Sequence, residues 1–288
     1  MRDQAEILRI KLQKLNNTTN STKTIAVISG KGGVGKSNVS INFSLSLLKQ
    51  GKKVLLFDMD IGMGNVDILL GLSSKHTIVD MLNEDISIHD VVKRGPAGLS
   101  YIAGGTGLST IFSLDHEKTK TFIEQLQLVL PEYDYLLFDM GAGITKESLE
   151  LLMAVDDIFV ITTPEPTAIT DAYSAMKYIY SLDKSIPYYL IVNRVHSENE
   201  GKQTLQRLYN VVSQFLHKET VQLGILPDDR TVLKAVSHQT PYILYAPRSN
   251  ISKAMVELTN RYLANQQIGE NKRSSPTFIS KLRNFLER

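Results

Sequence analysis

Short apolar runs rich in β-branched residues alternate with longer stretches of helical periodicity along most of the chain. Strands that are buried on both faces have this near-continuous apolar character, and their alternation with helices is typical of βαβ units around a parallel sheet. The pattern therefore predicts an α/β fold, namely one doubly wound domain with a mostly parallel sheet and helices on both faces. The strand-like runs are TIAVIS (24–29), KVLLFD (53–58), YDYLLFD (133–139), DIFVITT (157–163), YYLIVN (188–193) and VQLGIL (221–226), and the clearest helical stretches are 37–51 and 167–182.

Two polar stretches without apolar periodicity divide the chain further. Residues 16–23 are rich in Asn, Thr and Ser, and residues 266–277 include the run GENKRSSP, so both are expected to be linkers. They flank the predicted domain at 24–265. A short segment remains at each end, at 1–15 and at 278–288, and each has the apolar spacing of an amphipathic helix.

Composition excludes several classes of function. The chain has 288 residues, of which 42% are hydrophobic and 22% charged, and no run approaches the roughly 18 apolar residues of a spanning helix. The first residues lack the apolar region of a signal peptide, so we expect a cytoplasmic protein. The absence of cysteine excludes disulfides, thiol nucleophiles and cysteine-ligated zinc or iron–sulfur sites.

Charge is nearly balanced overall but uneven along the chain. The net charge is +2, yet residues 1–23 carry five Lys or Arg against two acidic residues, and residues 272–288 carry five against one. The body between them is therefore mildly acidic. This asymmetry favours terminal interaction segments over a uniformly basic surface for nucleic acid.

A glycine-rich loop joins the first predicted strand to the first predicted helix. Residues 30–37 match the phosphate-loop pattern G-x-x-x-x-G-K-[ST] in its strand–loop–helix context. The glycines let backbone N–H groups face a phosphate, Lys36 can reach the β- and γ-phosphates, and Ser37 can ligate Mg²⁺. We expect ATP or ADP with Mg²⁺ here. The expected contacts are Gly30, Lys31, Gly32, Gly33, Val34, Gly35, Lys36, Ser37 and Asn38.

Acidic residues follow two other predicted strands. Asp58 and Asp60 lie at the end of the second strand, and Asp139 ends YDYLLFD. Carboxyl ends of parallel strands adjoin the ligand crevice, so these carboxylates can hold Mg²⁺, directly or through water, or orient an attacking water, although one of the first pair could instead cap a helix. The expected metal ligands are Ser37, Asp58 and Asp139, and the expected switch residues are Asp58, Asp60, Gly62, Asn65, Asp139, Gly141 and Gly143.

Lys31 gives the loop a second lysine. The sequence K-G-G-V-G-K-S, together with D-x-D-I-G at 58–62, resembles the deviant Walker A ATPases of the MinD/ParA class. The resemblance implies a dimer that sandwiches two nucleotides and three catalytic residues: Lys31 reaching the partner's phosphates, Lys36 binding its own, and Asp60 positioning the hydrolytic water. A solvated loop lysine is the alternative for Lys31. Gly141 stands where MinD has proline, which is a departure at the second switch.

Two further turns match the class. They are VNR at 192–194 and ILPDD at 225–229. The resemblance implies that both surround the adenine, with Asn193 bonding its edge, Arg194 stacking on its face, and the turn at Pro227 and Asp228 contacting N6 through backbone carbonyls. Taken alone, each is also typical of a plain turn.

The C-terminal segment has an apolar face beside basic residues. MinD-like proteins carry a membrane-targeting helix at this place, so the resemblance implies a short, reversible anchor that two copies in a dimer would strengthen. The alternative is a helix docked on the protein's own core or on a partner. The expected membrane residues are Phe278, Ile279, Lys281, Leu282, Phe285 and Leu286.

The N-terminal segment carries a second resemblance. Residues 3–9, DQAEILR, are similar to the D-Q-A-x-x-L-R signature of the FlhG family (also YlxH or FleN), MinD-like ATPases that control flagellar number. The resemblance implies that this segment stimulates an FlhF-type GTPase, and a self-docking helix is the alternative. The expected partner residues are Asp3, Gln4, Ala5, Leu8 and Arg9.

These observations together predict a slow, dimer-dependent ATPase that regulates flagellar number and placement. The expected partners are a second copy of itself, an FlhF-type GTPase, flagellar C-ring switch proteins and the inner face of the cytoplasmic membrane, with no specific nucleic acid. A ParA-type partition ATPase that binds non-specific DNA is the alternative, against which the acidic body and the apolar C-terminal face count. A non-enzymatic adaptor with structural nucleotide is a third possibility.

Overall fold

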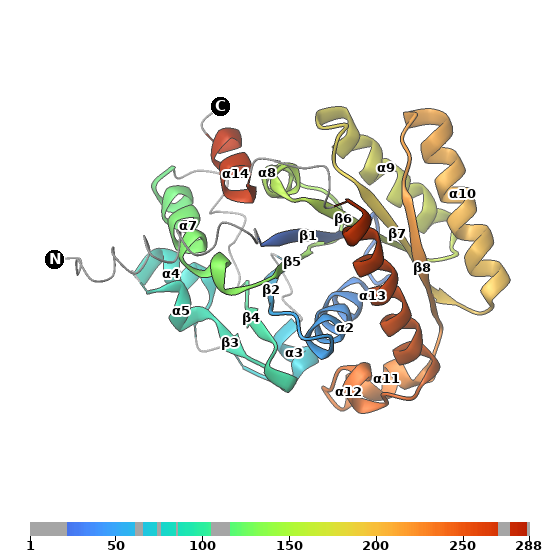
Figure 1. Ribbon diagram of the computed structural model, residues 1–288, viewed down its shortest axis with the longest axis horizontal. Helices are drawn as coiled ribbons and strands as arrows, with labels where there is room; N and C mark the ends of the chain where they lie inside the picture. Colours follow the sequence, from blue (N-terminus) through green and yellow to red (C-terminus); the bar gives the residue numbers. More distant parts are fainter. Residues whose placement is uncertain are drawn as a thin grey trace.

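The computed structural model describes residues 22–60, 66–73, 76–84, 86–104, 116–269 and 277–286. Within these residues an eight-stranded sheet has the order β3-β4-β2-β5-β1-β6-β7-β8, and only the edge strand β3 is antiparallel to its neighbour (Figure 1). The strands are β1 (Lys23–Ile28), β2 (Val54–Met59), β3 (Lys93–Arg94), β4 (Ser100–Ile102), β5 (Tyr135–Met140), β6 (Asp157–Thr162), β7 (Tyr188–Val195) and β8 (Val221–Pro227). The predicted mostly parallel α/β sheet is therefore confirmed.

Helices cover both faces of the sheet and enclose two hydrophobic cores. One core lies under α7 (His116–Val129), α8 (Lys146–Ala154), α9 (Pro166–Leu182), α10 (Glu198–Leu216) and α14 (Phe278–Leu286). The other lies under α2 (Lys36–Lys49), α11 (Arg230–Ser237), α12 (Tyr242–Tyr245) and α13 (Asn250–Gly269). The remaining elements are α3 (Val66–Leu70), α4 (Ile78–Glu84), α5 (Ile88–Val91), η1 (Pro96–Gly98) and η2 (Leu130–Glu132).

Strand β1 shows why the central runs are apolar at every position. Ala26 and Ile28 face one core, whereas Ile25 and Val27 face the other. Successive side chains of a strand point to opposite faces, so a strand between two helical layers has no solvent side. All six strand-like runs of the sequence form strands within a residue or two of the predicted ends.

The parallel arrangement brings the chemical residues to one edge of the sheet. Strands β1, β2, β5 and β6 are neighbours and run in the same direction, so their carboxyl ends lie side by side. The glycine-rich loop follows β1, and Asp58 and Asp139 occupy paired positions in β2 and β5. The carboxyl edge of the sheet is where ligands of open α/β folds bind.

The C-terminal helix α14 packs on the protein's own core, between α7 and α8 (Figure 1). The Phe278 and Leu282 side chains are only 4% and 0% exposed, and the Phe278 ring lies 5.5 Å from that of Phe138 in β5. The Lys281 ammonium lies 3.3 Å from an Asp156 carboxylate oxygen. The helix forms where the sequence predicts one, and its Phe278 and Leu282 side chains join the core beneath α7 and α8.

Helix α13 runs to Gly269, beyond residue 265, where the sequence places the end of the domain. Segment 1–15 and most of the linkers at 16–23 and 266–277 lie outside the described residues. In the described parts of the chain, no helix combines the length and the apolar character needed to cross a membrane.

Candidate functional site

The glycine-rich loop ends in an uncapped helix start. Gly33 and Gly35 have φ angles of 79° and 91°, in the left-handed region that glycine adopts readily, and α2 begins directly afterwards at Lys36. No side chain caps this helix. The first backbone N–H groups of α2 therefore face the loop with the positive end of the helix dipole, which is the arrangement that binds phosphate.

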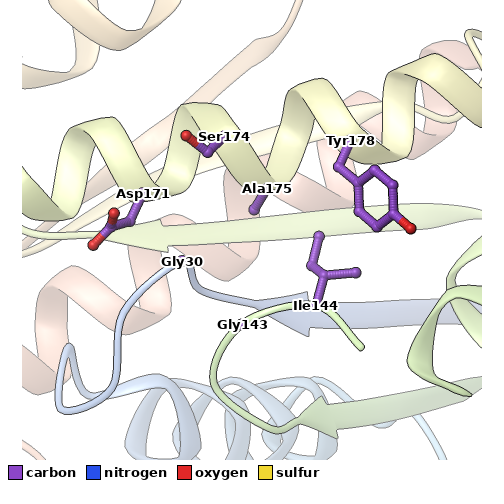
Figure 2. Close-up of a pocket in the computed structure, with 7 residues that line it drawn as sticks. All are labelled: Gly30, Gly143, Ile144, Asp171, Ser174, Ala175 and Tyr178. Carbon is purple, nitrogen blue, oxygen red and sulfur yellow. The ribbon is translucent and has the colours of Figure 1, made fainter. Parts of the chain in front are cut away.

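The start of the loop is fixed by contact with α9. A Cβ atom at Gly30 would lie 2.1 Å from the carbonyl carbon of Asp171, so only glycine fits there. Figure 2 shows one side of α9, with Asp171, Ser174 and Tyr178, facing the loops that carry Gly30 and Gly143 around a cavity of about 230 Å³. The amide of Gly143 also donates to the Ser29 carbonyl at 3.1 Å. The phosphate loop and the predicted second switch are thus in direct contact.

Asn193 holds the middle of the loop. Its Nδ2 donates to the Val34 carbonyl at 2.8 Å, and a Cβ atom at Gly35 would meet that nitrogen at 2.4 Å. Asn193 is nearly buried at the end of β7. The structure therefore shows that this side chain shapes the phosphate loop, and the predicted bond to adenine would have to use the second N–H of Nδ2 or the Oδ1 atom.

Lys36 forms a buried ion pair beneath the loop. Its Nζ lies 2.9 Å from Asp139 Oδ1, and the Ser40 hydroxyl donates to the same oxygen at 2.9 Å. Asp139 Oδ2 is buried and has no hydrogen-bond partner among the described residues. An unpaired carboxylate oxygen of this kind is costly to bury and is suited to a cation or its bound water.

Asp58 lies beside Asp139 in the register of β2 and β5. Burial, followed by the nearby Asp139 carboxylate, raises the pKa of Asp58 to about 7, although it accepts backbone N–H bonds from Asp60 and Val66. Two adjacent carboxylates and the Ser37 hydroxyl suit Mg²⁺, which usually takes one or two carboxylates and completes its shell with water and phosphate. No group of three or more His, Cys, Asp or Glu within the described ranges is placed to hold a metal.

Lys31, in contrast to Lys36, lies on the rim of the loop. Its side chain is 43% exposed, and Nζ donates to Glu165 Oε2 at 2.8 Å and approaches Thr167 Oγ1 at 3.4 Å. Hydrogen bonding to Lys31 lowers the pKa of Glu165, which keeps this carboxylate charged. The two lysines of the loop thus have opposite environments, one buried under the phosphate site and one at the surface.

Asp60 borders a cavity of about 240 Å³ between the two predicted switches. Met59 and Asp60 line one side, and Gly141, Gly143 and the start of α8 at Thr145 and Ser148 line the other. A Cβ atom at Gly141 would come no closer than 3.7 Å to the Asp60 carboxylate. The Cβ atom of an alanine at this position would therefore fit without a clash.

The predicted base-binding turns also lie near each other. The Asp228 amide donates to the Val195 carbonyl at 2.9 Å, and Val195 pairs with Pro227 in the sheet. Arg194 is exposed and has a φ of 57°, and it lies near the end of β7, where the pairing with β8 shifts register between Val192 and Val195. The Asp228 carboxylate lies 3.7 Å from the His196 ring.

Several predicted residues cannot be placed. Gly62 and Asn65 of the first switch, and Asp3, Gln4, Ala5, Leu8 and Arg9 of the partner segment, lie outside the described residues, as do the side chains of Phe285 and Leu286. Conversely, the sequence did not point to Glu165 or Ser40. Glu165 follows β6 at the same edge of the sheet as Asp58 and Asp139, and this position in the sequence could have identified it as a site residue.

Comparisons with known proteins agree with this geometry. A model of the ParA family, described as NUBPL iron-transfer P-loop NTPase, matches residues 20–263. Antiactivator FleN of Pseudomonas aeruginosa is 34% identical over 232 residues, which cover 81% of this chain and 83% of that protein. The flagellum site-determining protein YlxH of Helicobacter pylori is 33% identical over 251 residues, covering 86% and 84%. A solved chain of the MinC:MinD cell division protein complex of Aquifex aeolicus aligns with a TM-score of 0.69 at 28% identity, covering 88% of this chain and 98% of that one.

Proposed function

Because this chain belongs to the ParA/MinD family of P-loop NTPases, whose members are ATPases, we propose that it is an ATP-switched dimer that regulates flagellar number and placement. The names of its FleN and YlxH relatives support the flagellar role. The observation that best supports an ATP-dependent switch is the contrast between the two lysines of the loop. Lys36 is buried against Asp139, whereas Lys31 is exposed at the rim.

Nucleotide binding uses the uncapped start of α2 and Lys36. The backbone N–H groups of 33–37 receive the phosphates, and Lys36 exchanges the Asp139 carboxylate for the β- and γ-phosphates. Ser37, Asp58 and Asp139 would hold Mg²⁺, which would neutralise part of the phosphate charge. Asp139 Oδ2, buried and otherwise unpaired among the described residues, supports this assignment.

Hydrolysis is slow and requires the dimer. Asp60, on the cavity between the switches, orients the attacking water. Lys31 leaves Glu165 and reaches the partner's phosphates, where a second positive charge stabilises the transition state. An exposed ion pair of this kind contributes little to stability, so Lys31 is released at low cost when the partner arrives.

Membrane attachment uses α14 in a second position. Phe278 and Leu282 now fill the groove between α7 and α8, and the same side chains cannot also lie in a bilayer. Helix α8 begins at the second switch, in the wall of the Asp60 cavity, and packs against α14. Movement of the switch on ATP binding therefore loosens the groove, and the dimer presents two freed helices to the membrane.

The terminal segments define the partners. In this proposal residues 1–15 stimulate an FlhF-type GTPase, residues 278–288 bind the cytoplasmic face of the membrane, and residues 16–23 and 266–277 connect both to the ATPase body. Flagellar C-ring switch proteins are the further partners. The iron-transfer role in the description of the family model does not suit this chain, because it has no cysteine to hold iron–sulfur chemistry.

ATP turnover measured against protein concentration tests the enzymatic part. A dimer-dependent ATPase has a specific activity that rises with concentration and then levels off, whereas a monomeric ATPase has a constant specific activity. Counting flagella on cells that carry Asp60→Ala tests the biological part, since a locked ATP state should change their number. Unchanged flagellation at normal protein level would contradict the flagellar role.

A further inference from the structure

Helices α11 and α12 present apolar side chains to solvent at the end of the molecule away from α14 (Figure 1). Leu233 is 71% exposed, more than any other large hydrophobic side chain in the described residues, and Val236 and Tyr245 are 37% and 38% exposed. Within α11 only Ala235 is buried. The packing of the domain thus leaves the outer side of α11 without an apolar partner.

These residues form one continuous surface. Leu233 and Val236 are three positions apart and therefore neighbours on the side of α11. The ring of His238, which follows α11, lies 5.1 Å from the ring of Tyr245 in α12, and its Nδ1 lies 2.8 Å from the Lys234 carbonyl. We call Leu233, Val236, His238 and Tyr245 the α11–α12 surface.

Positive charge predominates in the stretch of chain that forms the α11–α12 surface. Residues 230–256 contain Arg230, Lys234, Arg248 and Lys253 but no Asp or Glu. All four are exposed, and none forms an ion pair with another described residue.

The nearest acidic residues on either side are already engaged. Asp229 caps α11 through the Thr231 amide, and Glu257 pairs with Arg261. Asp228, which is 53% exposed, lies 3.7 Å from the His196 ring, and none of these three carboxylates forms an ion pair with Arg230, Lys234, Arg248 or Lys253.

The surface is also rigidly supported from below. The Ile243 amide donates to Asn42 Oδ1 at 2.9 Å, and Lys49 Nζ donates to the Ile243 carbonyl at 2.9 Å, so α12 is tied to α2 at two points. The Ile251 amide contacts Asp229, the residue that caps α11. A surface with fixed geometry loses little conformational entropy when a partner binds.

We propose that the α11–α12 surface docks an acidic, amphipathic segment of another protein, in which apolar residues cover Leu233, Val236 and Tyr245 and carboxylates face the surrounding cations. An acidic partner is favoured because its carboxylates complement the positive charges of residues 230–256. Residues 1–23 of the same chain are basic and would be repelled. A two-fold contact between copies would place like charges opposite one another.

Two other classes of ligand fit less well. A nucleic acid would leave the apolar centre unused. A membrane bound through α14 would lie at the other end of the molecule, because α14 and the α11–α12 surface are far apart (Figure 1).

The test uses a fluorescein-labelled 18-residue peptide with leucines at i, i+3 and i+4 spacing and glutamates between them. A matched peptide carries lysines in place of the glutamates. Fluorescence anisotropy at low salt should show that the acidic peptide binds the full chain and the basic peptide does not. Leu233→Glu and Lys234→Glu should each weaken binding by at least about tenfold. Leu182→Glu, at a 51% exposed position on α9, should bind as the wild type does.

The other occupants are outcomes of the same experiment. Equal affinity of the acidic peptide for Leu233→Glu and the wild type, equal binding of the basic peptide, or no binding of either peptide overturns the proposal. The proposal is also overturned if Leu233→Glu loses vesicle binding, duplex DNA binding or ATP-dependent dimerisation. In those cases the surface would bind lipid, nucleic acid or a second copy of the chain, respectively. The peptide measurement needs no nucleotide, so its result is independent of the proposed ATP switch.

Discussion

Lys31 donates a hydrogen bond to Glu165 of its own chain, with 2.8 Å between Nζ and Oε2. The two residues come from the phosphate loop and from the turn after β6, and both side chains are substantially exposed. Lys31 thus contacts the turn after β6, whereas Lys36 lies beneath the loop against Asp139. In the proposed switch, this pair is the resting position from which Lys31 moves to a second copy of the chain.

Lys31→Ala should abolish ATP-dependent dimerisation and turnover while leaving nucleotide binding by the monomer nearly intact. The reason is that Lys36 and the start of α2 supply the contacts to the chain's own nucleotide. Equilibrium binding of a fluorescent ATP analogue, together with light scattering, measures both properties. Glu165→Gln is the companion variant: it weakens the resting contact and should shift dimerisation to lower protein concentration. A Lys31→Ala protein that dimerises normally would show that Lys31 is a plain surface lysine.

Gly30→Ala should lower the thermal unfolding midpoint by at least about 3 °C, because overpacking typically costs about 1–3 kcal/mol. The added Cβ would meet the α9 backbone at 2.1 Å, and that backbone cannot move without disturbing the core beneath it. Gly32→Ala is the matched control, since its Cβ would meet nothing nearer than 3.8 Å. Differential scanning calorimetry without nucleotide compares the two, and equal midpoints would contradict the tight contact between the loop and α9.

Asn193→Ala should weaken ATP binding by roughly tenfold, since an unsatisfied buried carbonyl costs about 1–3 kcal/mol and 1.4 kcal/mol corresponds to a factor of ten. The substitution removes the donor that holds the Val34 carbonyl in the phosphate loop. Asn210→Ala, at an exposed position of α10, serves as the control. If the affinity for inorganic triphosphate is unchanged while that for ATP falls, Asn193 acts on the base and the loop-shaping role is wrong.

Asp156→Asn should increase vesicle binding by the ADP-bound protein. Asp156 accepts bonds from the backbone and hydroxyl of Thr24 through one oxygen and contacts Lys281 of α14 through the other. The amide can still accept from Thr24 but turns an N–H group toward Lys281, so the docked helix loses its anchor while the residues of α14 stay unchanged. Co-sedimentation with anionic vesicles measures the effect, and Glu257→Gln, which alters an exposed pair on α13, should have none. If Asp156→Asn binds vesicles no better than the wild type, the docked position of α14 does not control membrane attachment.

Much of the fold followed from periodicity, because central strands that are buried on both faces have an unmistakable apolar pattern. Strands β3 and β4 were not predicted, since they have only two and three residues and leave too short a pattern to detect. The phosphate loop and the Asp58–Asp139 pair were predicted because parallel strands bring their carboxyl ends together, and the structure places these two residues in register.

The remaining contacts depend on tertiary packing that a linear pattern does not contain. The motif assigns Asn193 to the base, yet its amide donates a hydrogen bond to the Val34 carbonyl, because β7 ends beside the loop. Lys31 and Glu165 are separated by 134 positions, and only the order of strands around β1 makes them neighbours. The amphipathic pattern of residues 278–288 fits a membrane and a protein groove equally well, and the structure was needed to show the groove.

The most direct test of the account is light scattering of the purified full chain in ADP and in ATP, with and without anionic vesicles, using Asp60→Ala to retain the ATP state. We expect a monomer in ADP that does not bind vesicles. In ATP we expect a dimer that binds them. Vesicle binding of equal strength in both nucleotides would contradict the coupling of α14 to the switch. A protein that stays monomeric in ATP would show that two copies do not complete the active site.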